Sequence, residues 1–369
     1  MSKSEVYFMD IRASAKENLL GRVVRLADRL DLKQIVPARA LVAIKLHFGE
    51  KGNTAYIRPT FVRQIVDRVK ALGAFPFLTD ANTLYAGTRG DSISHLHTAI
   101  ENGFSFSVVN APLIIADGLR GASYATVKIQ QDLLKTAYIA KEIAEADSLI
   151  SLAHFKGHEL SGFGGTIKNL GMGCASRRGK MVEHADVSPK ITRKKCIGCG
   201  ACVEHCSQSA ISLREEKAML DANKCIGCGE CILICPNKAI DVHWNADMAL
   251  FQKKMAEYAF AVVKGKKGRA AFLNFLTQIS PACDCYAHSD APIVQDLGIL
   301  ASVDPVAIDQ ASMDMVNRQK ALEGTALTAN KEPGQDKFRG LYPKVDCTIQ
   351  LEHAEKIGLG FRDYELVAI

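Results

Sequence analysis

The strongest chemical signal in the chain is a cysteine pattern that occurs twice. Both copies have the spacing C-x2-C-x2-C-x3-C, and the second begins at Cys225, 29 residues after Cys196. Three closely spaced thiolates can hold three corners of an iron–sulfur cubane, and the fourth cysteine ligates the cluster of the other copy. Glycines between the cysteines permit tight turns and leave backbone N–H groups that can face cluster sulfurs. We therefore expect two [4Fe–4S] clusters, one held by Cys196, Cys199, Cys202 and Cys235 and the other by Cys225, Cys228, Cys231 and Cys206.

An alternative use of this repeat is a pair of zinc sites. Zinc rarely needs four cysteines in so compact a run, and the doubled motif with an Ala-Ile pair after each copy fits the ferredoxin pattern. Ser207 departs from that pattern, because proline is usual there, but the change removes no thiolate.

Between Lys190 and His243 there are 8 basic and 6 acidic side chains, unlike an acidic mobile carrier. This charge fits a tethered relay with an acidic redox partner, or a surface that only keeps the protein in solution.

A second group of polar residues follows a predicted buried strand. His154, Lys156 and His158 alternate, so on an extended segment their side chains point the same way. Together with Lys168 they are candidates for catalytic proton transfer and anion binding, whereas lone histidines are usually satisfied within the fold. The Gly-rich stretch 162–173 could offer backbone N–H groups to an anion, although it matches no nucleotide-binding fingerprint. The candidate cofactor-binding residues are Gly164, Gly165, Asn169 and Asp290.

Three cysteines outside the repeat form a candidate third site. Cys283 and Cys285 are two residues apart, a spacing that does not favour a disulfide between them but can chelate a metal. With Cys174 and a histidine they could hold a third metal or cluster, or one thiolate could act as a nucleophile or redox group. The alternative is ordinary buried cysteine, which we expect for Cys347.

The elements that must position these residues alternate between strands and helices. This order predicts an α/β fold with a mainly parallel sheet covered by helices. Ligands bind at the carboxyl ends of parallel strands, and polar residues follow the predicted strands repeatedly, so we expect them to converge on one edge. Among them, Asp80 and Asp304 could instead be plain helix caps. The predicted strands are 6–9, 41–48, 75–79, 107–116, 148–154, 270–279 and 299–302, and the predicted helices are 19–30, 59–72, 92–102, 136–146, 246–264 and 306–318.

The cysteine repeat interrupts this α/β pattern. The segment after it is short and begins with a helix, so we expect it to complete the N-terminal sheet. Two separate α/β domains are the alternative. The predicted division is an α/β host domain in two parts, 1–188 and 244–369, with a small inserted α+β ferredoxin-like 2[4Fe–4S] domain at 189–243.

Composition limits the function further. Apolar residues make up 48% of the chain, which suits a packed globular protein and excludes wholesale disorder. No apolar run approaches the roughly 18 to 20 residues that span a bilayer, and the first 20 residues lack a signal-peptide pattern. We therefore expect a cytoplasmic protein with no membrane partner, in which clustered cysteines are metal ligands. The net charge of +6 is too small to indicate nucleic acid, and the basic run 177–195 lacks aromatic platforms.

The chain also resembles a known family. The residues that carry the resemblance are His154-Phe-Lys-Gly-His158, Gly162-Phe-Gly-Gly165, Lys168-Asn-Leu-Gly-Met-Gly-Cys174-Ala-Ser-Arg, Cys283-Asp-Cys285, Ser289-Asp-Ala-Pro292 and Asp304-Pro-Val-Ala-Ile-Asp309. They are similar to the large family of uncharacterised Fe–S centre proteins, a domain of unknown function numbered 362. The resemblance covers nearly the whole chain. It implies two [4Fe–4S] clusters inserted in the family domain and a redox role in anaerobic metabolism, but it supplies no substrate.

These signals lead to three hypotheses for function. The first is a ferredoxin-type oxidoreductase, in which electrons pass through the clusters to a substrate or a bound cofactor, a flavin included, in the strand-end crevice. A redox partner protein or a small molecule would donate or accept those electrons. The second is a non-enzymatic electron carrier or a scaffold that handles a metal or cluster with Cys174, Cys283 and Cys285. The third, nucleic-acid binding, ranks last, and the sequence leaves the oligomeric state open.

Overall fold

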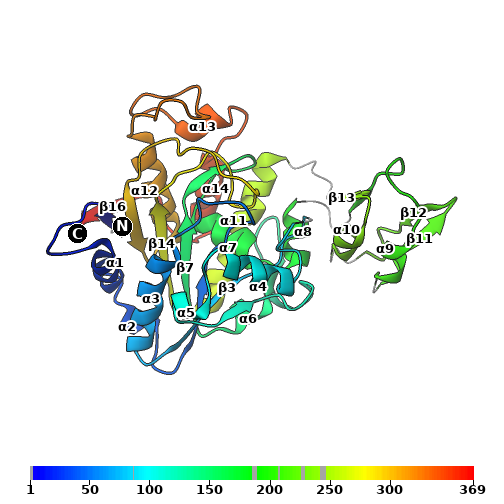
Figure 1. Cartoon of the computed structure of the whole chain (residues 1–369), viewed down its shortest axis with the longest axis horizontal. Helices are drawn as coiled ribbons and strands as arrows, with labels where there is room; N and C mark the ends of the chain where they lie inside the picture. Colours follow the sequence, from blue (N-terminus) through cyan, green and yellow to red (C-terminus); the bar gives the residue numbers. More distant parts are fainter. Residues whose placement is uncertain (1–2, 86, 185–188, 207, 226–228, 242–246) are drawn as a thin grey trace.

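One large sheet forms the centre of the molecule (Figure 1). The computed structural model describes residues 3–85, 87–184, 189–206, 208–225, 229–241 and 247–369. The strands of the sheet are β1 Ser4–Asp10, β2 Leu41–Lys45, β3 Phe75–Asp80, β4 Leu113–Ile115, β7 Ser148–His154, β14 Ala270–Leu276, β15 Gly298–Ser302 and β16 Tyr364–Ala368. Their order is β16-β1-β15-β14-β7-β2-β3-β4, and β15 is antiparallel to both of its neighbours. All other neighbouring pairs of these described strands are parallel, which confirms the mainly parallel α/β fold.

The sheet separates two apolar layers. Along β14, Phe272 and Leu276 face one layer while Leu273 and Phe275 face the other. Every residue of β7 and β14 is buried, as expected for central parallel strands covered on both faces. The helices on the Leu273 side are α1 Leu19–Asp28, α2 Leu32–Ile35, α3 Pro59–Ala71, α4 Ser92–Glu101 and α5 Phe106–Val109. Those on the Phe272 side include α7 Thr166–Cys174, α11 Met248–Lys266, α12 Pro305–Asn317, α13 Lys337–Leu341 and α14 Thr348–Lys356.

Segments from both ends of the chain share this sheet. β14, which follows the cysteine repeat, pairs in parallel with β7, which precedes it. The last strand, β16, pairs in parallel with the first, β1. The two parts of the host therefore form one sheet rather than two. The predicted domain boundaries after residues 188 and 243 fall at residues 185–188 and 242–246, which lie outside the described residues.

Two predicted elements of the host are wrong in part. Residues 136–146, predicted as a helix, begin with strand β6 Thr136–Ala140, paired with β5 Tyr124–Lys128, and only α6 Lys141–Glu145 is helical. The T-A-Y-I-A run buries every second residue, and that period suits a strand. Residues 107–116, predicted as a strand, begin within α5 Phe106–Val109. Asn110 adopts a left-handed conformation, which ends this helix.

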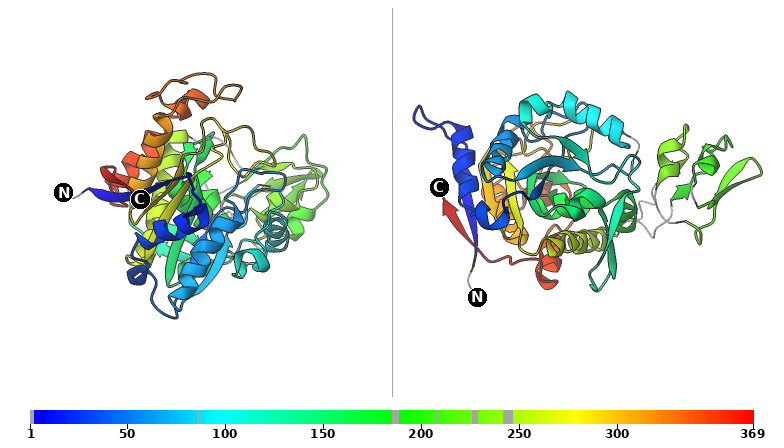
Figure 2. Two further views of the ribbon diagram at one scale, coloured as in Figure 1. Left: turned by 60° about the vertical axis from the view of Figure 1, so that its left-hand side comes forward. Right: turned by 90° about the horizontal axis from the view of Figure 1, so that it is seen from below.

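The cysteine repeat folds into a small unit beside the sheet body (Figure 2). Its described residues form two short antiparallel pairs and two short helices. The pairing of Ile191 with Ile240 corresponds to that of Leu220 with Ile211 after a shift of 29 residues, so the two halves are related by internal symmetry. Its elements are β10 Lys190–Ile191, α9 Ala201–Glu204, β11 Ile211–Arg214, β12 Lys217–Leu220, α10 Glu230–Ile234 and β13 Ile240–Asp241. Among the described helices of the chain, none is both long and apolar enough to cross a membrane.

Candidate functional site

Polar side chains at the ends of neighbouring strands surround a cavity of about 340 Å³. Lys45 ends β2 and is followed by His47, while Asp80 ends β3. The segment after β7 contributes Lys156 and His158, the two ends of the short strand β8. Because β2, β3 and β7 are parallel, these residues emerge at the same edge of the sheet. The convergence expected from the order of the elements is therefore present for these three strands, but not for Asp304, because β15 before it is antiparallel to β14.

A buried ionic network forms one wall of this cavity. Lys45 Nζ lies 3.1 Å from Asp80 Oδ1, and Arg89 reaches Asp80 Oδ2 at 3.4 Å and Glu50 Oε2 at 3.1 Å. Burial alone raises the pKa of Asp80, but Lys45 and the nearby His95, whose Nε2 lies 3.7 Å from Asp80 Oδ2, hold it well below its ordinary value. Asp80 is thus a charge partner and not the helix cap considered from the sequence. Asp304 is a cap: its Oδ1 accepts from two backbone N–H groups at the start of α12.

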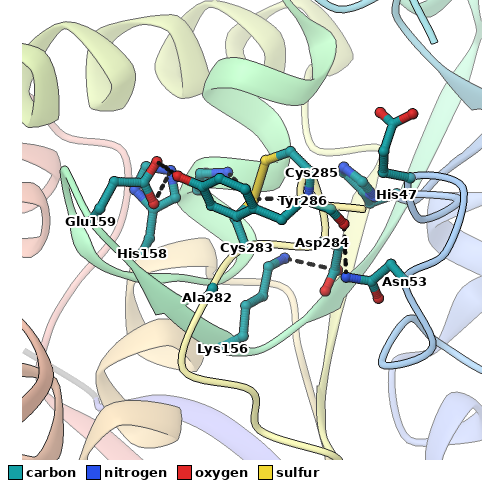
Figure 3. The surroundings of a disulfide bond; sticks show 12 residues. His47, Asn53, Lys156, His158, Glu159, Ala282, Cys283, Asp284, Cys285 and Tyr286 are labelled. Atoms are coloured by element: carbon teal, nitrogen blue, oxygen red, sulfur yellow. Dashed lines mark hydrogen bonds and ion pairs between the residues drawn. A yellow bond between two sulfur atoms is a disulfide. The ribbon is translucent and has the colours of Figure 1, made fainter. Parts of the chain in front are cut away.

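Cys283 and Cys285 are joined by a disulfide at the edge of the cavity (Figure 3). The expectation that these two residues do not pair with each other is wrong. Tyr286 N donates to Cys283 O at 3.1 Å, so the chain makes a tight turn that brings the two Cα atoms to 5.2 Å. That separation is within the normal range for a disulfide, whereas an extended chain holds such residues farther apart.

Asp284, between the two cysteines, anchors this turn in the protein interior. Its Oδ1 lies 2.8 Å from His154 Nδ1, and its Oδ2 lies 3.3 Å from Lys156 Nζ. Burial raises the pKa of Asp284, but His154 and Lys156 outweigh that effect and hold it far below its ordinary value. His154 Nε2 faces the carbonyl oxygen of Thr277 at 2.9 Å, so both ring nitrogens have acceptors. The predicted catalytic residue His154 is therefore engaged in holding the turn, while Lys156 also lines the cavity.

His158 and Lys168 present their side chains to the cavity. His158 Nδ1 lies 2.9 Å from Ser161 Oγ and accepts from the backbone N–H of Ser161 at 3.2 Å, which places its proton on Nε2. Burial, followed by the charges of Lys168 and Lys156, holds the pKa of His158 well below its ordinary value. Lys168 Nζ lies 3.3 Å from Cys283 Sγ. Burial, followed by Lys156, lowers the pKa of Lys168 to about 7, so its charge can change near neutral pH.

The Gly-rich stretch runs through β9 Gly162–Gly164 and most of α7, and the first N–H groups of α7 hold an anion from the protein itself. The carboxylate of Asp309 accepts from the backbone N–H groups of Thr166 at 2.7 Å and Ile167 at 2.8 Å. A Cβ on Gly165 would come within 2.3 Å of Asp309 Oδ1, so this position has no room for a side chain. Burial raises the pKa of Asp309 to about 6. The N–H groups proposed from the sequence to bind a ligand are therefore already used by Asp309.

The remaining candidate cofactor-binding residues lie in different places. Asn169 lines the cavity, where its Oδ1 accepts from Lys45 Nζ at 2.8 Å and orients that side chain. Gly164 lies in β9 Gly162–Gly164, paired with Lys156 of β8. Asp290 is exposed and accepts from the backbone N–H that follows it. The cavity thus brings together Asn169 with Lys156, His158 and Lys168, but not Asp290.

The candidate third metal site is not assembled. Cys174 is fully buried, its Sγ lies 3.7 Å from Asn169 O, and burial raises its pKa to about 11. Cys283 and Cys285 are already bonded to each other. Within the described part of the chain, no group of three or more His, Cys, Asp and Glu side chains is placed to hold a single metal ion. The expectation of a site built from all three cysteines is therefore not supported by this geometry.

Several cavity residues were missed by the sequence analysis. Arg89 and Tyr85 come from a loop, and Lys180 comes from α8 Arg177–His184. Lys180 Nζ donates to the carbonyl oxygens of Asn82 at 2.9 Å and Ala175 at 2.7 Å. Lys45 was missed as well, although the sequence carried a signal for it: it is a charged residue inside an otherwise apolar strand. Among the described residues, neither Lys168 nor Lys180 has a carboxylate at ion-pair distance. Carboxylates farther away still affect the pKa of both lysines.

In the cysteine-rich unit, the described members of each predicted quartet line a small cavity of their own. All four cysteines of the first quartet line one cavity, and the described members of the second quartet line the other. Backbone N–H groups face the sulfurs in equivalent places: Ala210 N is 3.3 Å from Cys206 Sγ, and Ala239 N is 3.1 Å from Cys235 Sγ. Cys228 lies outside the described residues. The cysteines at the first cavity are Cys196, Cys199, Cys202 and Cys235, and those at the second are Cys206, Cys225 and Cys231.

Helix α10, which carries Cys231, connects the second quartet to the host cavity. Glu230 at its start accepts from Arg177 Nη1 at 3.0 Å and from Arg120 Nη1 at 2.7 Å. Leu84, which lines the host cavity, packs in one apolar cluster with residues of the cysteine-rich unit. A Cβ on Gly229 would lie 2.7 Å from Leu84 Cδ1, so the two parts are in close contact here. Cys231 of the second quartet, two residues after Gly229, therefore lies close to this contact.

Comparison with known proteins identifies a family but no activity. The family model described as "Domain of unknown function (DUF362)" matches residues 42–314. No curated protein matches the chain. Among solved structures, the lactate racemase apoprotein from Thermoanaerobacterium thermosaccharolyticum is similar, with 14% sequence identity and a TM-score of 0.38. The match covers 74% of this chain and 51% of that protein, so the chain spans about half of its length.

Proposed function

Because this chain belongs to the family described as Domain of unknown function (DUF362), we propose its function from the geometry of its site. The protein is an iron–sulfur redox protein. Two [4Fe–4S] clusters in the cysteine-rich unit relay electrons, one at a time, between an external redox partner and an anionic substrate or cofactor in the host cavity. The observation that carries this proposal is the position of α10, which carries Cys231 and begins beside Leu84 in the wall of that cavity.

The donor atoms of the first quartet fit a cluster better than a single zinc ion. Four thiolates around a cubane bind four different irons, so they lie farther apart than the four ligands of one ion. The four cysteines of the first quartet come from two runs and line one cavity, as expected for the ligands of a cubane. Backbone N–H groups directed at sulfur, such as Ala218 N at 3.4 Å from Cys196 Sγ, suit a cluster because they stabilise its negative charge.

The charges in the host cavity favour an anionic ligand. Lys45 and Arg89 are compensated by Asp80 and Glu50, and Lys156 is compensated by Asp284. Lys168 and Lys180 remain without a direct carboxylate partner among the described residues. A carboxylate or phosphate group would satisfy both ammonium groups in this buried setting. His158 Nε2–H supplies a further hydrogen-bond donor at the cavity wall.

Anaerobic reconstitution tests the cluster part of this proposal. We expect about eight irons and eight sulfides per chain, together with the electron paramagnetic resonance signals of reduced [4Fe–4S] centres. Stoichiometric zinc in place of iron and sulfide would contradict the proposal. Isothermal titration with inorganic phosphate and with oxalate tests the cavity. Weakened binding of either probe in Lys168→Met and Lys180→Met, but not in the exposed-site variant Lys331→Met, supports an anion site there.

A further inference from the structure

The Cys283–Cys285 disulfide lies where a ligand in the host cavity could reach it. Cys285 lines the cavity and is half-buried, while Cys283 is completely buried behind it. Figure 3 shows the bridge beside Tyr286, among the labelled side chains of the site. A disulfide that exposes one sulfur and shelters the other can be attacked or reduced from one side only. This placement favours a chemical role for the disulfide over a structural one.

The size of the loop argues against a structural role. A disulfide stabilises a fold mainly by closing a loop in the unfolded chain, and the effect grows with the length of that loop. Here Cys283 and Cys285 enclose a single residue, Asp284. The turn is also held without the disulfide, because Asp284 is bound by His154 and Lys156, and its carbonyl oxygen accepts from Glu50 N at 3.0 Å. The bond therefore adds little constraint, and the two sulfurs would stay adjacent after it opened.

Lys168 is placed to stabilise the product of reduction. Its Nζ lies 3.3 Å from Cys283 Sγ, the sheltered sulfur. A neighbouring ammonium lowers the pKa of a thiol and so favours the thiolate. The pKa of Lys168 near 7 allows its amine to take up a proton when negative charge appears on that sulfur. Backbone support is also present, since Cys285 N lies 3.4 Å from Cys283 Sγ.

We propose that Cys283–Cys285 is a redox-active disulfide that accepts an electron pair from the two clusters, an inference that rests on the proposed function above. Each reduced cluster gives one electron, so together the clusters supply the two electrons that break the S–S bond. Cys285 takes one proton from water and becomes a thiol. Cys283 becomes a thiolate paired with Lys168, whose amine takes the second proton from water. The ultimate reductant is a low-potential one-electron donor, of the reduced viologen or reduced iron–sulfur protein class.

The test counts thiols in the reconstituted holoprotein before and after anaerobic addition of reduced methyl viologen. Alkylation followed by peptide mass spectrometry should find Cys283 and Cys285 unlabelled before reduction and both labelled after it. The protein should also take up two electrons beyond those that reduce the clusters. Clusters that reduce normally while this peptide stays disulfide-bonded would overturn the inference and leave the proposed function intact. Failure to assemble clusters would instead contradict the proposed function, and dithiothreitol titration of the same peptide would then decide the redox activity of the bond separately.

Variants separate the electron acceptor from general effects on folding. The double variant Cys283→Ser/Cys285→Ser should lose the two additional electrons and keep both cluster signals. Cys347→Ser is the matched control, because Cys347 is similarly buried but lies against Met313 and Asp336, away from the cavity lining. Lys168→Met should slow alkylation of the reduced pair near neutral pH, and Lys168→Arg should restore it. Unchanged electron uptake in the double variant would show that the acceptor is elsewhere.

Discussion

The cysteine-rich unit and the host cavity assemble their candidate sites in opposite ways. In the cysteine-rich unit, the predicted ligands come from two runs, 196–206 and 225–235, and the described members of each quartet line a cavity. In the host, the side chains come from segments as distant in the sequence as Lys45 and Cys285. The prediction of ligands in the first region therefore rests on local spacing, whereas the second site depends on the order and direction of strands. This difference can be tested by substituting residues in one region and measuring the properties of the other.

Loss of a cluster ligand should give the largest effect. Cys235→Ser removes one of the four thiolates at the first cavity, so we expect the iron content of the reconstituted protein to fall from about eight to about four per chain. The host should retain its thermal unfolding midpoint, because Cys235 packs in the apolar cluster of the cysteine-rich unit and not in the layers of the sheet. Iron analysis and circular dichroism check both expectations. Iron that stays near eight would contradict the assignment of Cys235, and Cys347→Ser serves as the control.

Removal of the central buried charge of the host should be the next largest effect. Asp284→Asn leaves His154 and Lys156 without their carboxylate partner, and breaking a buried ion pair in this way costs about 3–5 kcal/mol. Urea unfolding should show this loss. Asp290→Asn is the matched control, because Asp290 is exposed and its substitution should change the free energy of unfolding by less than about 0.5 kcal/mol. Equal effects of the two variants would contradict the anchoring role of Asp284.

Anion binding in the host cavity should depend on pH through Lys168. Its pKa of about 7 means that the ammonium is present below pH 7 and is lost as pH rises through that value. Beyond burial, Lys156 and Lys45 act to lower this pKa, while Glu159 and Asp284 act to raise it. Oxalate affinity should therefore fall above pH 7, and Lys168→Met should weaken binding at pH 6 by about tenfold or more, since a charged hydrogen bond contributes about 1.5–3 kcal/mol. Calorimetric titration at several pH values checks this, and a flat profile in the unmodified protein would contradict it.

The same titration of Lys168 should affect stability in the opposite direction. Its pKa is lower in the folded protein than the ordinary 10.5, so the unfolded chain binds more protons between pH 7 and 10.5. The contribution of Lys168 to the free energy of unfolding should therefore rise with pH across this interval. Urea unfolding of the unmodified protein and of Lys168→Met at several pH values isolates that contribution, because the variant lacks the titrating group. A difference between the two proteins that stays constant with pH would be evidence against the lowered pKa.

Substitution of Gly165 should affect stability less than the loss of Asp284. The new Cβ in Gly165→Ala would lie 2.3 Å from Asp309 Oδ1, so the carboxylate that caps α7 must shift, at a cost of about 1–3 kcal/mol. Gly265→Ala is the matched control, because a Cβ added to this helical glycine would meet no atom within 4 Å, and we expect a gain of about 0.4–1 kcal/mol. Thermal unfolding of both variants should give opposite signs. An unchanged thermal unfolding midpoint in Gly165→Ala would show that capping of α7 by Asp309 does not depend on its close approach to Gly165.

Most of the host fold was predictable because its elements have strong local periods. The strands ending at Lys45, Asp80 and His154 and the helices beginning at Leu19, Pro59 and Ser92 lie close to their predicted positions. The run 136–140 was assigned wrongly because its alternation is only five residues long and also fits a helix. The site was less predictable. β15 is antiparallel to β14, so Asp304 emerges at the opposite edge of the sheet from the cavity, contrary to the convergence expected for every strand.

The sequence alone predicted how the cysteines of the repeat are grouped, because the ferredoxin spacing places three ligands of each cluster in one run and the fourth in the other run. It also determined the α/β class through the alternation of apolar periods. Only the tertiary structure decided that Asp309 fills the N–H groups of the Gly-rich stretch, and that Cys283 and Cys285 pair beside Lys168. The contacts of Asp309 with Thr166 and of Lys168 with Cys283 join residues more than 100 positions apart. Such pairs depend on strand order and on turns, which no local spacing encodes.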